Sequence, residues 1–264
     1  MQTMSNFYAK KSLGQNFLKS PGIFLKIARS AKISPEDVVL EIGPGQGGLT
    51  EQLLKFGKKV IAVEKDHRLI PILQEKFSKE IKSNKLVLIE ADILNFQPTT
   101  YNLQPNNYLL VANIPYYITG AIFKKFLELG PQPKTIVLLT QKEVAERIIA
   151  RDEKESILSI SVKVYGKPHI AGIVPRGAFT PTPKVDSAIL VIENISKKLF
   201  IKNKVDEKTF FKILKTGFAH KRKKLSGNLK KIVKKEAFDA HKISLDARAE
   251  DLTVSDWFGL ASPN

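Results

Sequence analysis

The 264-residue sequence contains no cysteine, which excludes disulfide bonds and thiolate metal sites. No apolar run approaches the roughly 18 residues that cross a membrane, and Met1–Lys19 has no continuous apolar segment of the kind found in secretory signals. The four histidines are scattered without the spacing of metal ligands, so no metal site is expected. These absences predict a cytoplasmic protein with no membrane partner and no metal.

Acidic residues are scarce in one part of the chain. The window Ser196–Lys235 holds 15 Lys and Arg but only two acidic residues, a net +13 of the chain's +17. A basic field this concentrated favours a polyanionic partner such as nucleic acid, whereas a lysine-rich solvated surface is the alternative. The densest cluster, the candidate for phosphate contacts, is Lys221, Arg222, Lys223 and Lys224.

The first two-thirds of the chain alternates short β-rich runs with helical patterns. This rhythm predicts an α/β fold with a doubly wound, mostly parallel sheet. The expected strands are Val38–Ile42, Val60–Glu64, Leu86–Glu90, Tyr108–Ala112 and Thr135–Thr140. The expected helices are Ile23–Ala31, Leu49–Phe56, Arg68–Lys79, Ala121–Leu129 and Lys142–Ile149.

The character of the sequence changes after Glu193. Ile157–Tyr165 and Ala188–Glu193 are expected to be the last strands, and beyond them lysines become dense and apolar residues recur at helical spacing. The pattern therefore predicts two domains, 1–195 with the sheet and 196–264 as a smaller, basic helical domain.

A glycine-rich loop, Gly43–Gly48, follows the first expected strand of the sheet. A nucleotide-phosphate loop needs a lysine where Leu49 stands, so a nucleoside triphosphate site is not expected. Gly43, Gly45 and Gly48 match the dinucleotide pattern G-x-G-x-x-G, and Glu64 follows about twenty residues on. Taken alone, this match leaves a nicotinamide dehydrogenase open.

The acidic residues around the loop favour a different cofactor. Glu41 at its mouth and Pro44, which lacks an amide donor, are both unfavourable for a pyrophosphate. S-adenosylmethionine has no phosphate and carries an ammonium, a sulfonium and a ribose. Glu41 can favour its cationic end, Glu64 can accept from the ribose hydroxyls, and Asp92 can accept from the adenine amine. Solvated loop acids are the alternative for each residue taken singly.

The segment Asn113–Tyr116 closes the fourth expected strand, where ligands bind in open α/β sheets. An exocyclic adenine amine is a poor nucleophile because its lone pair is delocalised into the ring. An Asn carbonyl and a backbone carbonyl can each accept one of its N–H bonds, which favours a more nucleophilic nitrogen. Pro115 fixes φ near the site, and Tyr116 offers a flat face for a base. The segment therefore indicates amine methylation, with an ordinary turn as the alternative.

Five ordered motifs resemble those of the ribosomal RNA adenine N6,N6-dimethyltransferases. They are Lys11–Leu18, Glu41–Gly45, Leu49-Thr50, Asn113–Tyr116 and Phe179–Ser187, while Arg248–Leu252 and Trp257–Ala261 are also similar to the family. The similarity covers nearly the whole chain. It implies a Rossmann-like methyltransferase sheet that uses S-adenosylmethionine, followed by a small all-helical domain that binds ribosomal RNA.

The resemblance also implies roles for individual residues. Asn113, Pro115 and Tyr116 are the candidate catalytic residues, and Tyr116 and Phe179 would sandwich a flipped target adenine. A phenylalanine in a proline-rich turn is otherwise a core anchor, which is the alternative for Phe179. With the acids above, the candidate cofactor contacts are Asn16, Leu18, Glu41, Gly43, Gly45, Glu64, Asp92 and Asn113.

The family has two branches that share this fold. The housekeeping branch dimethylates two adjacent adenines in a hairpin near the 3′ end of small-subunit (16S) rRNA, and the macrolide-resistance branch modifies one large-subunit (23S) adenine. Pro44 and the Gly47–Thr50 stretch resemble the housekeeping loop. We therefore expect a monomeric housekeeping enzyme acting on the assembling 30S particle, with the resistance type, or an assembly factor whose methylation is dispensable, as alternatives.

Overall fold

The computed structural model describes residues 9–10, 14–220 and 222–262. The chain separates into two compact units, each built from two segments. The first, here called the sheet unit, comprises Met1–Ala145 and His169–Ile195. The second, the helical unit, comprises Glu146–Pro168 and Ser196–Asn264. None of the helices in the described ranges is long and apolar enough to cross a membrane.

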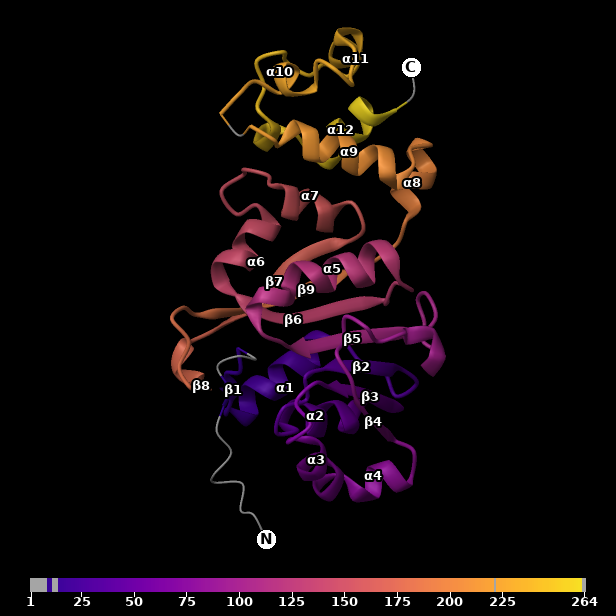
Figure 1. Ribbon diagram of the computed structural model, residues 1–264, viewed down its shortest axis with the longest axis vertical. Coiled ribbons are helices and arrows are strands. Elements are labelled where there is room, and N and C mark those ends of the chain that lie inside the picture. The colour runs from indigo at the N-terminus through magenta and orange to yellow at the C-terminus, as the bar shows by residue number, and fades with distance from the viewer. Residues whose placement is uncertain (1–8, 11–13, 221, 263–264) are drawn as a thin grey trace. The chain divides into compact units, whose positions relative to one another are not determined.

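A seven-stranded sheet forms the centre of the sheet unit, in the order β4-β3-β2-β5-β6-β9-β7 (Figure 1). The first five strands of this order, from β4 through β3, β2 and β5 to β6, are parallel to one another. Strand β9 runs antiparallel to β6. The strand bounds are β2 Val38–Ile42, β3 Lys59–Glu64, β4 Leu86–Glu90, β5 Tyr108–Asn113, β6 Thr135–Gln141, β7 Lys167–Val174 and β9 Ser187–Glu193. The expected α/β class and six of the seven expected strands are thus confirmed, whereas β7 was not expected.

The five expected helices are found with small shifts at their ends. They are α1 Pro21–Ser30, α2 Gly48–Phe56, α3 Ile70–Lys76 with α4 Ser78–Lys82, α5 Thr119–Phe123 continued by the π-helix η5 Lys124–Leu129, and α6 Lys142–Ile149. Two 3-10 turns, η3 Pro98–Tyr101 and η4 Tyr116–Ile118, lie in the connections that precede and follow β5. The η4 turn begins directly after Pro115, so the fixed φ of that proline sets its start.

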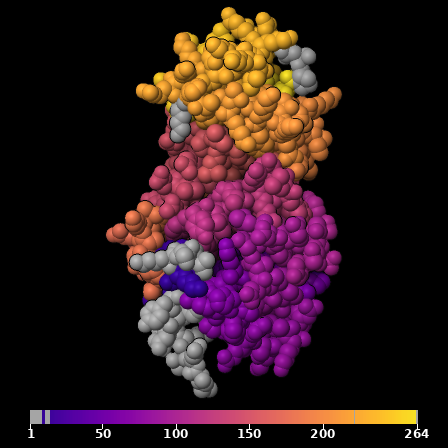
Figure 2. All heavy atoms as spheres, in the orientation of Figure 1, coloured from indigo at the N-terminus to yellow at the C-terminus, as the bar shows by residue number. Residues whose placement is uncertain are grey.

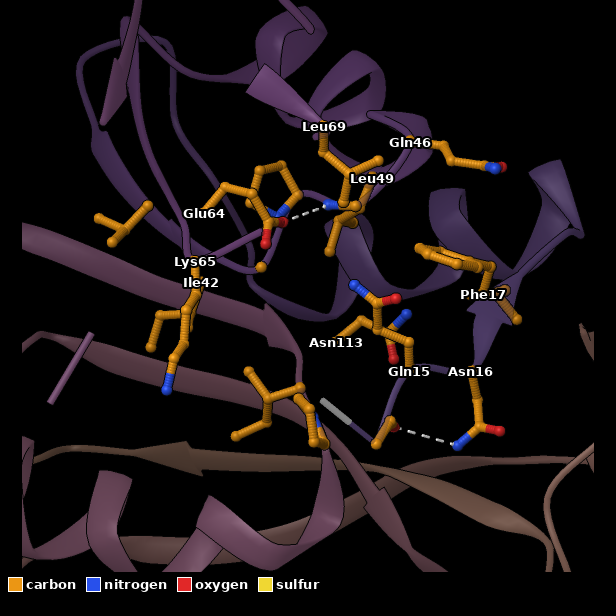
Figure 3. Close-up of a pocket in the computed structure, with 18 of the residues that line it drawn as sticks. Gln15, Asn16, Phe17, Ile42, Gln46, Leu49, Glu64, Lys65, Leu69 and Asn113 are labelled. Carbon is orange, nitrogen blue, oxygen red and sulfur yellow. Dashed lines mark hydrogen bonds between the residues drawn. The ribbon is translucent and has the colours of Figure 1, made fainter. Parts of the chain in front are cut away.

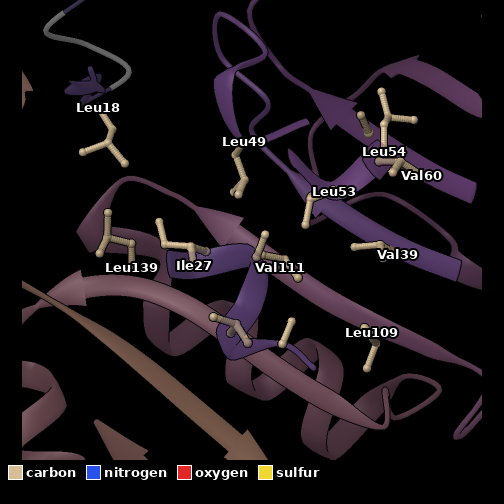
Figure 4. Packing of buried hydrophobic residues seen from close by; sticks show 14 of the residues in the cluster. Leu18, Ile27, Val39, Leu49, Leu53, Leu54, Val60, Leu109, Val111 and Leu139 are labelled. Atoms are coloured by element: carbon tan, nitrogen blue, oxygen red, sulfur yellow. The ribbon is translucent and has the colours of Figure 1, made fainter. Parts of the chain in front are cut away.

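Apolar side chains of the central strands and of the first two helices form one core cluster (Figure 4). Val39 and Val111 are completely buried on neighbouring strands, and Ile27 of α1 and Leu53 of α2 are buried in the same cluster. Burial of such a side chain stabilises the fold by roughly 1.5–3 kcal/mol. The core therefore fixes the carboxyl ends of β2 and β5, from which the loops with the predicted site residues emerge.

A short antiparallel pair joins the N-terminal arm to a segment far along the chain. Strand β1, Phe17–Leu18, pairs with β8, Phe179–Thr180, so that Leu18 lies opposite Phe179. Figure 2 shows the indigo arm residues beside the orange residues around β8. No local sequence pattern predicts a two-residue pairing between segments this distant in sequence, so the β1–β8 pair was not expected.

The helical unit is held by an aromatic cluster. Phe210 of α9 packs on Phe200 and Phe258 with ring centroids 5.5 and 4.7 Å apart, and Phe218 stacks on Trp257 at 5.5 Å. Asp206 is the N-cap of helix α9, because its side chain accepts a hydrogen bond from the Thr209 N–H at 2.9 Å. The helices are α7 Ile157–Lys163, α8 Lys198–Asn203, α9 Glu207–Gly217, α10 Leu225–Leu229, α11 Lys235–Ala240 and α12 Val254–Ala261.

The expected strand Ile157–Tyr165 is wrong, because residues Ile157–Lys163 form helix α7. Its apolar residues alternate as in a strand, but a capping box between Ser156 and Ser159 starts a helix there. Beyond the helix, Tyr165 stacks on Phe211 at 6.2 Å and packs on Phe200 at 5.5 Å. These contacts explain why 146–168 belongs to the helical unit, although we had placed all of 1–195 in one domain.

Candidate active site

A cavity of about 440 Å³ opens at the carboxyl ends of strands β2, β3, β4 and β5. Its walls combine the N-terminal arm, the glycine-rich loop, the residues that follow each strand, and Phe179 of β8. Figure 3 shows Glu64, Asn113, Gln15 and Asn16 around the same open space. Segments separated by more than a hundred residues thus meet at one edge of the sheet, where α/β folds bind their ligands.

Most of the predicted site residues line this cavity. Of the eight candidate cofactor contacts, seven do so: Asn16, Leu18, Gly43, Gly45, Glu64, Asp92 and Asn113. Pro115, Tyr116 and Phe179 line it as well, so both the expected cofactor residues and the expected base-binding residues share one cavity.

Glu41 is the exception, since it lies behind the cavity wall. Successive residues of a strand point to opposite faces, and Ile42 takes the lining position. Glu41 is 0% exposed, and no described residue donates a hydrogen bond of standard geometry to either carboxylate oxygen. Burial raises the pKa of Glu41 to about 8. Thr50 lowers this pKa, whereas the nearby Glu64 carboxylate raises it further. The expected direct contact between Glu41 and the cofactor is therefore not found.

Glu64 ends β3 and is held by two backbone donors. Its Oε2 accepts from the Gly45 N–H at 3.1 Å and its Oε1 accepts from the Asp66 N–H at 2.8 Å. Burial raises the Glu64 pKa, while these two hydrogen bonds oppose the rise. Each carboxylate oxygen has a second acceptor direction. A fixed acceptor pair at the wall of a cavity is suited to a vicinal diol such as a ribose.

Asp92, two residues beyond β4, is paired with a cation that we had not expected. Lys65 Nζ lies 2.8 Å from Asp92 Oδ2, and the Leu94 N–H donates to Oδ1 at 2.9 Å. The hydrogen bond from Lys65 is the main cause that lowers the Asp92 pKa, so the carboxylate is ionised at neutral pH. Lys65 directly follows Glu64 and also lines the cavity. Its position directly after β3 places it at the binding edge of the sheet, but the sequence does not show its partner.

The glycine-rich loop depends on glycine at two positions in particular. Gly45 has φ +58°, a left-handed conformation that places its N–H on Glu64. A Cβ on Gly48 would lie 2.3 Å from the Phe24 ring, so a larger residue at this position would require the Phe24 side chain of α1 to move. The amino end of α2 therefore lies at the cavity, with Gly48 and Leu49 among its lining residues.

The Asn113–Tyr116 segment leaves β5 and turns into η4. Ile118 donates its N–H to the Pro115 carbonyl at 3.3 Å, which closes the turn. The Tyr116 hydroxyl lies 2.7 Å from Ser187 Oγ, so the first residue of β9 holds the ring by its far end. Burial raises the Tyr116 pKa, with the Ser187 hydrogen bond opposing the rise. The motif around Asn113 and the motif that ends at Ser187 are thus joined by a side-chain contact.

Phe179 lines the cavity but is only 2% exposed. It belongs to the same core cluster as Leu18, its partner across the β1–β8 pair. The ring therefore acts as a core anchor here, and stacking of a base on it requires a shift of the groups that cover it.

The N-terminal arm is tied to the sheet by Gln15, a residue absent from our candidate set. Gln15 Nε2 donates to Asp66 Oδ2 at 2.8 Å, and the Lys10 N–H donates to Gln15 Oε1 at 2.8 Å. Arg68 also binds Asp66, with Nη2 2.6 Å from Oδ2, and this hydrogen bond is the main cause that lowers the Asp66 pKa to about 2. An ionised, buried Asp66 thus fixes the arm beside the cavity.

None of the described residues of the basic window is among the residues that line this cavity. Apart from half-buried Lys197 and from Lys221, which lies outside the described residues, its lysines and arginines are exposed. Arg222, Lys223 and Lys224 lie between α9 and α10, and Lys224 Nζ is 2.6 Å from Asp246 Oδ1. A group of three or more metal-ligand side chains is not found in the described part of the chain.

Comparisons with known proteins identify one family of similar sequences. The family model for ribosomal RNA adenine dimethylase matches residues 6–262. A ribosomal RNA small subunit methyltransferase A from Dehalococcoides mccartyi is 42% identical over 255 residues, covering 94% of this chain and 86% of the relative.

Two solved structures share the fold over almost the full length. A dimethyladenosine transferase from Plasmodium falciparum has a TM-score of 0.77 and 30% identity, covering 92% of this chain and 95% of that one. The 23S rRNA methyltransferase ErmE has a TM-score of 0.75 and 27% identity, covering 93% and 98%.

Proposed function

The chain belongs to the ribosomal RNA adenine dimethylase family, and we propose that it acts on the small-subunit RNA. The product would be N6,N6-dimethyladenine at two adjacent adenines near the 3′ end. The relative at 42% identity is a small-subunit enzyme, whereas the large-subunit enzyme ErmE is 27% identical, and this difference supports the small-subunit assignment. The main structural support for a methyl transfer to adenine is that Glu64, Asn113 and Tyr116 line the same cavity.

The cavity fits S-adenosylmethionine, the methyl donor of this enzyme class. The volume of the cavity is within the range of pockets that hold small organic ligands. Glu64 would hold the ribose hydroxyls with the acceptor directions that Gly45 and Asp66 leave open. Asp92 would accept from the adenine amine, while Lys65 keeps its carboxylate ionised and oriented.

Other groups of the cavity suit the amino-acid end of the cofactor. The amino terminus of α2 carries a partial positive charge and unpaired N–H groups, which favour a carboxylate. Asn16 and Leu18 of the arm would cover this end of the cofactor, because both line the cavity. We assign no direct contact to Glu41.

Asn113 and a backbone carbonyl would bind the target amine. Ile118 already donates to the Pro115 carbonyl, so we assign the second acceptor to the carbonyl of Ile114, which also lines the cavity. When bound, the cofactor supplies an electrophilic methyl group on a cationic sulfur, which is already a good leaving group. The protein therefore needs to position and polarise the amine, and the proton can leave after the nitrogen has become cationic.

Tyr116 would stack on the flipped adenine, with its ring held in place by Ser187. Phe179 would form the second face of the base pocket only after the β1–β8 pair moves, since the ring is buried. We propose that the sheet unit is the catalytic domain. The basic window of the helical unit would contact rRNA phosphates through exposed residues such as Arg222 and Lys223.

The proposed setting is the assembling 30S particle in the cytoplasm, with the enzyme acting as a monomer. The test is transfer of labelled methyl groups to small ribosomal subunits from cells that lack this enzyme, followed by mapping of the labelled positions. We expect label in two adjacent adenines near the 3′ end and none in purified large subunits, which serve as the control. Absence of label from small-subunit adenines, or label in a large-subunit adenine alone, would overturn the proposal.

A further inference from the structure

Tyr117 is a large aromatic residue that faces solvent at the cavity. It is 68% exposed and yet belongs to the cavity lining. Tyr116 and Tyr117 are successive residues of the η4 turn, but only Tyr116 is held by its hydroxyl on Ser187. A single exposed aromatic residue on a surface needs no explanation by itself. Tyr117, however, lies at the opening of the cavity, next to the residue proposed to stack on the target base. This position makes its exposed ring a candidate for binding a second base.

The Tyr117 ring is supported on one side. A Cβ built on Gly14 would lie 3.2 Å from Tyr117 Cε1 and 3.3 Å from Pro115 Cβ, so the arm and the proline both lie against this position. The rest of the ring is open, as its exposure shows. A ring that is backed by protein and open to solvent can accept a second aromatic group with little loss of side-chain freedom.

Basic and apolar groups continue the surface beside Tyr117. Lys65 lines the same cavity as Tyr117, and its ammonium lies 2.8 Å from the Asp92 carboxylate. Leu94, 40% exposed, also lines the cavity, and Lys125 Nζ donates to its carbonyl at 3.0 Å. Tyr117, Leu94, Lys65 and Lys125, here called the mouth surface, thus combine a stacking ring with two ammonium groups.

We propose that the mouth surface binds the nucleotide adjoining the target adenine, with its base stacked on Tyr117 and its phosphates near Lys65 and Lys125. This inference rests on the proposed RNA substrate. Tyr117 is the exposed neighbour of Tyr116 in η4 and lines the same cavity, so a strand with one base against Tyr116 can place its next base on Tyr117. Stacking on aromatic side chains and contact of lysines with phosphates are how proteins bind single-stranded nucleic acid. With two adjacent adenines as targets, the surface holds the second adenine while the first reacts.

The test compares Tyr117→Ala and Tyr117→Phe with Leu129→Ala as a control. Leu129 is also exposed, at 69%, and is not among the cavity-lining residues. For each protein, the Kd for S-adenosylmethionine is measured by calorimetry, and kcat and KM are measured with unmethylated small subunits. We expect Tyr117→Ala to lower kcat/KM for subunits roughly ten-fold, mainly through KM, because base stacking is lost. Tyr117→Phe keeps the ring and should stay within about three-fold of wild type.

The cofactor measurement separates stacking from a merely structural role. If Tyr117 only packs against the arm, Tyr117→Ala weakens S-adenosylmethionine binding and lowers the melting temperature, with KM for subunits following these changes. That result, or a Tyr117→Ala enzyme equal to the Leu129→Ala control, overturns the inference. Failure of the wild-type enzyme to methylate small subunits is a separate result, because it contradicts the proposed function itself.

Discussion

The Tyr116 hydroxyl lies 2.7 Å from Ser187 Oγ, and this contact joins the Asn113–Tyr116 motif to the Phe179–Ser187 motif. A tyrosine held at both its backbone and its hydroxyl presents its ring face in one orientation. The turn that carries Tyr116 is itself closed by Thr119, whose Oγ1 donates to the Tyr116 carbonyl at 2.9 Å. The ring face that we propose to stack on the adenine is therefore fixed in orientation without a bound base.

Removing this hydrogen bond should weaken catalysis without affecting the cofactor. We expect Ser187→Ala and Tyr116→Phe each to lower kcat/KM for small subunits about two- to ten-fold, since one neutral hydrogen bond contributes about 0.5–1.5 kcal/mol. Tyr116→Ala, which also removes the ring, should lower it further. Steady-state kinetics check these values, and calorimetry should give an unchanged Kd for S-adenosylmethionine. Additive losses in the Ser187→Ala, Tyr116→Phe double variant would contradict a shared contact.

Asn113 should affect turnover far more than cofactor binding. Its side chain is assigned to the target amine, and loss of one polarising group at a reacting centre costs on the order of 10²–10³ in rate. We expect Asn113→Ala to lower kcat by about that factor while the Kd for S-adenosylmethionine stays within about three-fold. Single-turnover methylation and calorimetry measure the two quantities. A large rise in Kd with a small change in kcat would instead assign Asn113 to the cofactor alone.

The same variant addresses the assembly-factor alternative. If catalytically inactive Asn113→Ala restores small-subunit maturation in cells that lack the enzyme, binding rather than methylation is the required activity. Sedimentation profiles of ribosomal particles provide the measurement.

The strands could be read from the sequence because their apolar runs are local and nearly continuous, as in Tyr108–Ala112. The helix at Ile157 could not, because its alternating residues imitate a strand and the decisive feature is the Ser156 cap. Five of the seven cavity residues, Gly43, Gly45, Glu64, Asp92 and Asn113, lie at or just after strand ends, which a parallel sheet brings to one edge. Asn16 and Leu18 of the arm came from the family resemblance alone. Glu41 was misplaced because one residue along a strand reverses the face to which a side chain points.

Other features of the site depend on contacts between distant segments. The burial of Phe179 and its pairing with Leu18 arise from the β1–β8 pair, which no local pattern encodes. The same holds for the Gln15–Asp66 hydrogen bond that fixes the arm. Lys65 was overlooked because a lysine after a strand is usually solvated, and its ion pair with Asp92 is visible only in three dimensions.

Glu41 makes the stability of the protein depend on pH in an unusual direction. The folded protein keeps this carboxyl protonated up to a pKa of about 8, whereas the unfolded chain releases the proton near the ordinary value of 4.5. Between these values the folded state binds more protons, so the free energy of unfolding falls as pH rises. Glu41→Gln removes this dependence and keeps the size of the side chain.

We therefore expect the stability of Glu41→Gln relative to wild type to increase from pH 5 to pH 8 by a few kcal/mol. Urea unfolding at pH 5, 6.5 and 8 measures the difference, and any fixed cost of the Gln side chain cancels in the comparison between pH values. A difference that is the same at all three pH values would show that Glu41 ionises normally in the folded protein.

The exposed cations before α10 should contribute to RNA binding through charge alone. Arg222 and Lys223 are exposed, whereas Lys224 is already paired with Asp246. Each phosphate contact adds roughly 0.7–0.9 to the slope of log affinity against log salt concentration. The double variant Arg222→Gln, Lys223→Gln should therefore bind small subunits more weakly and reduce the slope by about 1.5, with cofactor affinity unchanged.

The matched control for this pair is Lys79→Gln, Lys82→Gln, which removes two exposed lysines from α4 in the sheet unit. Filter binding of small subunits between low and physiological salt measures the slopes. Both double variants lower the net charge by the same amount, so a general field effect would change them equally. A reduced slope in the Arg222, Lys223 variant alone indicates direct phosphate contacts, and equal slopes in the two variants would contradict such contacts.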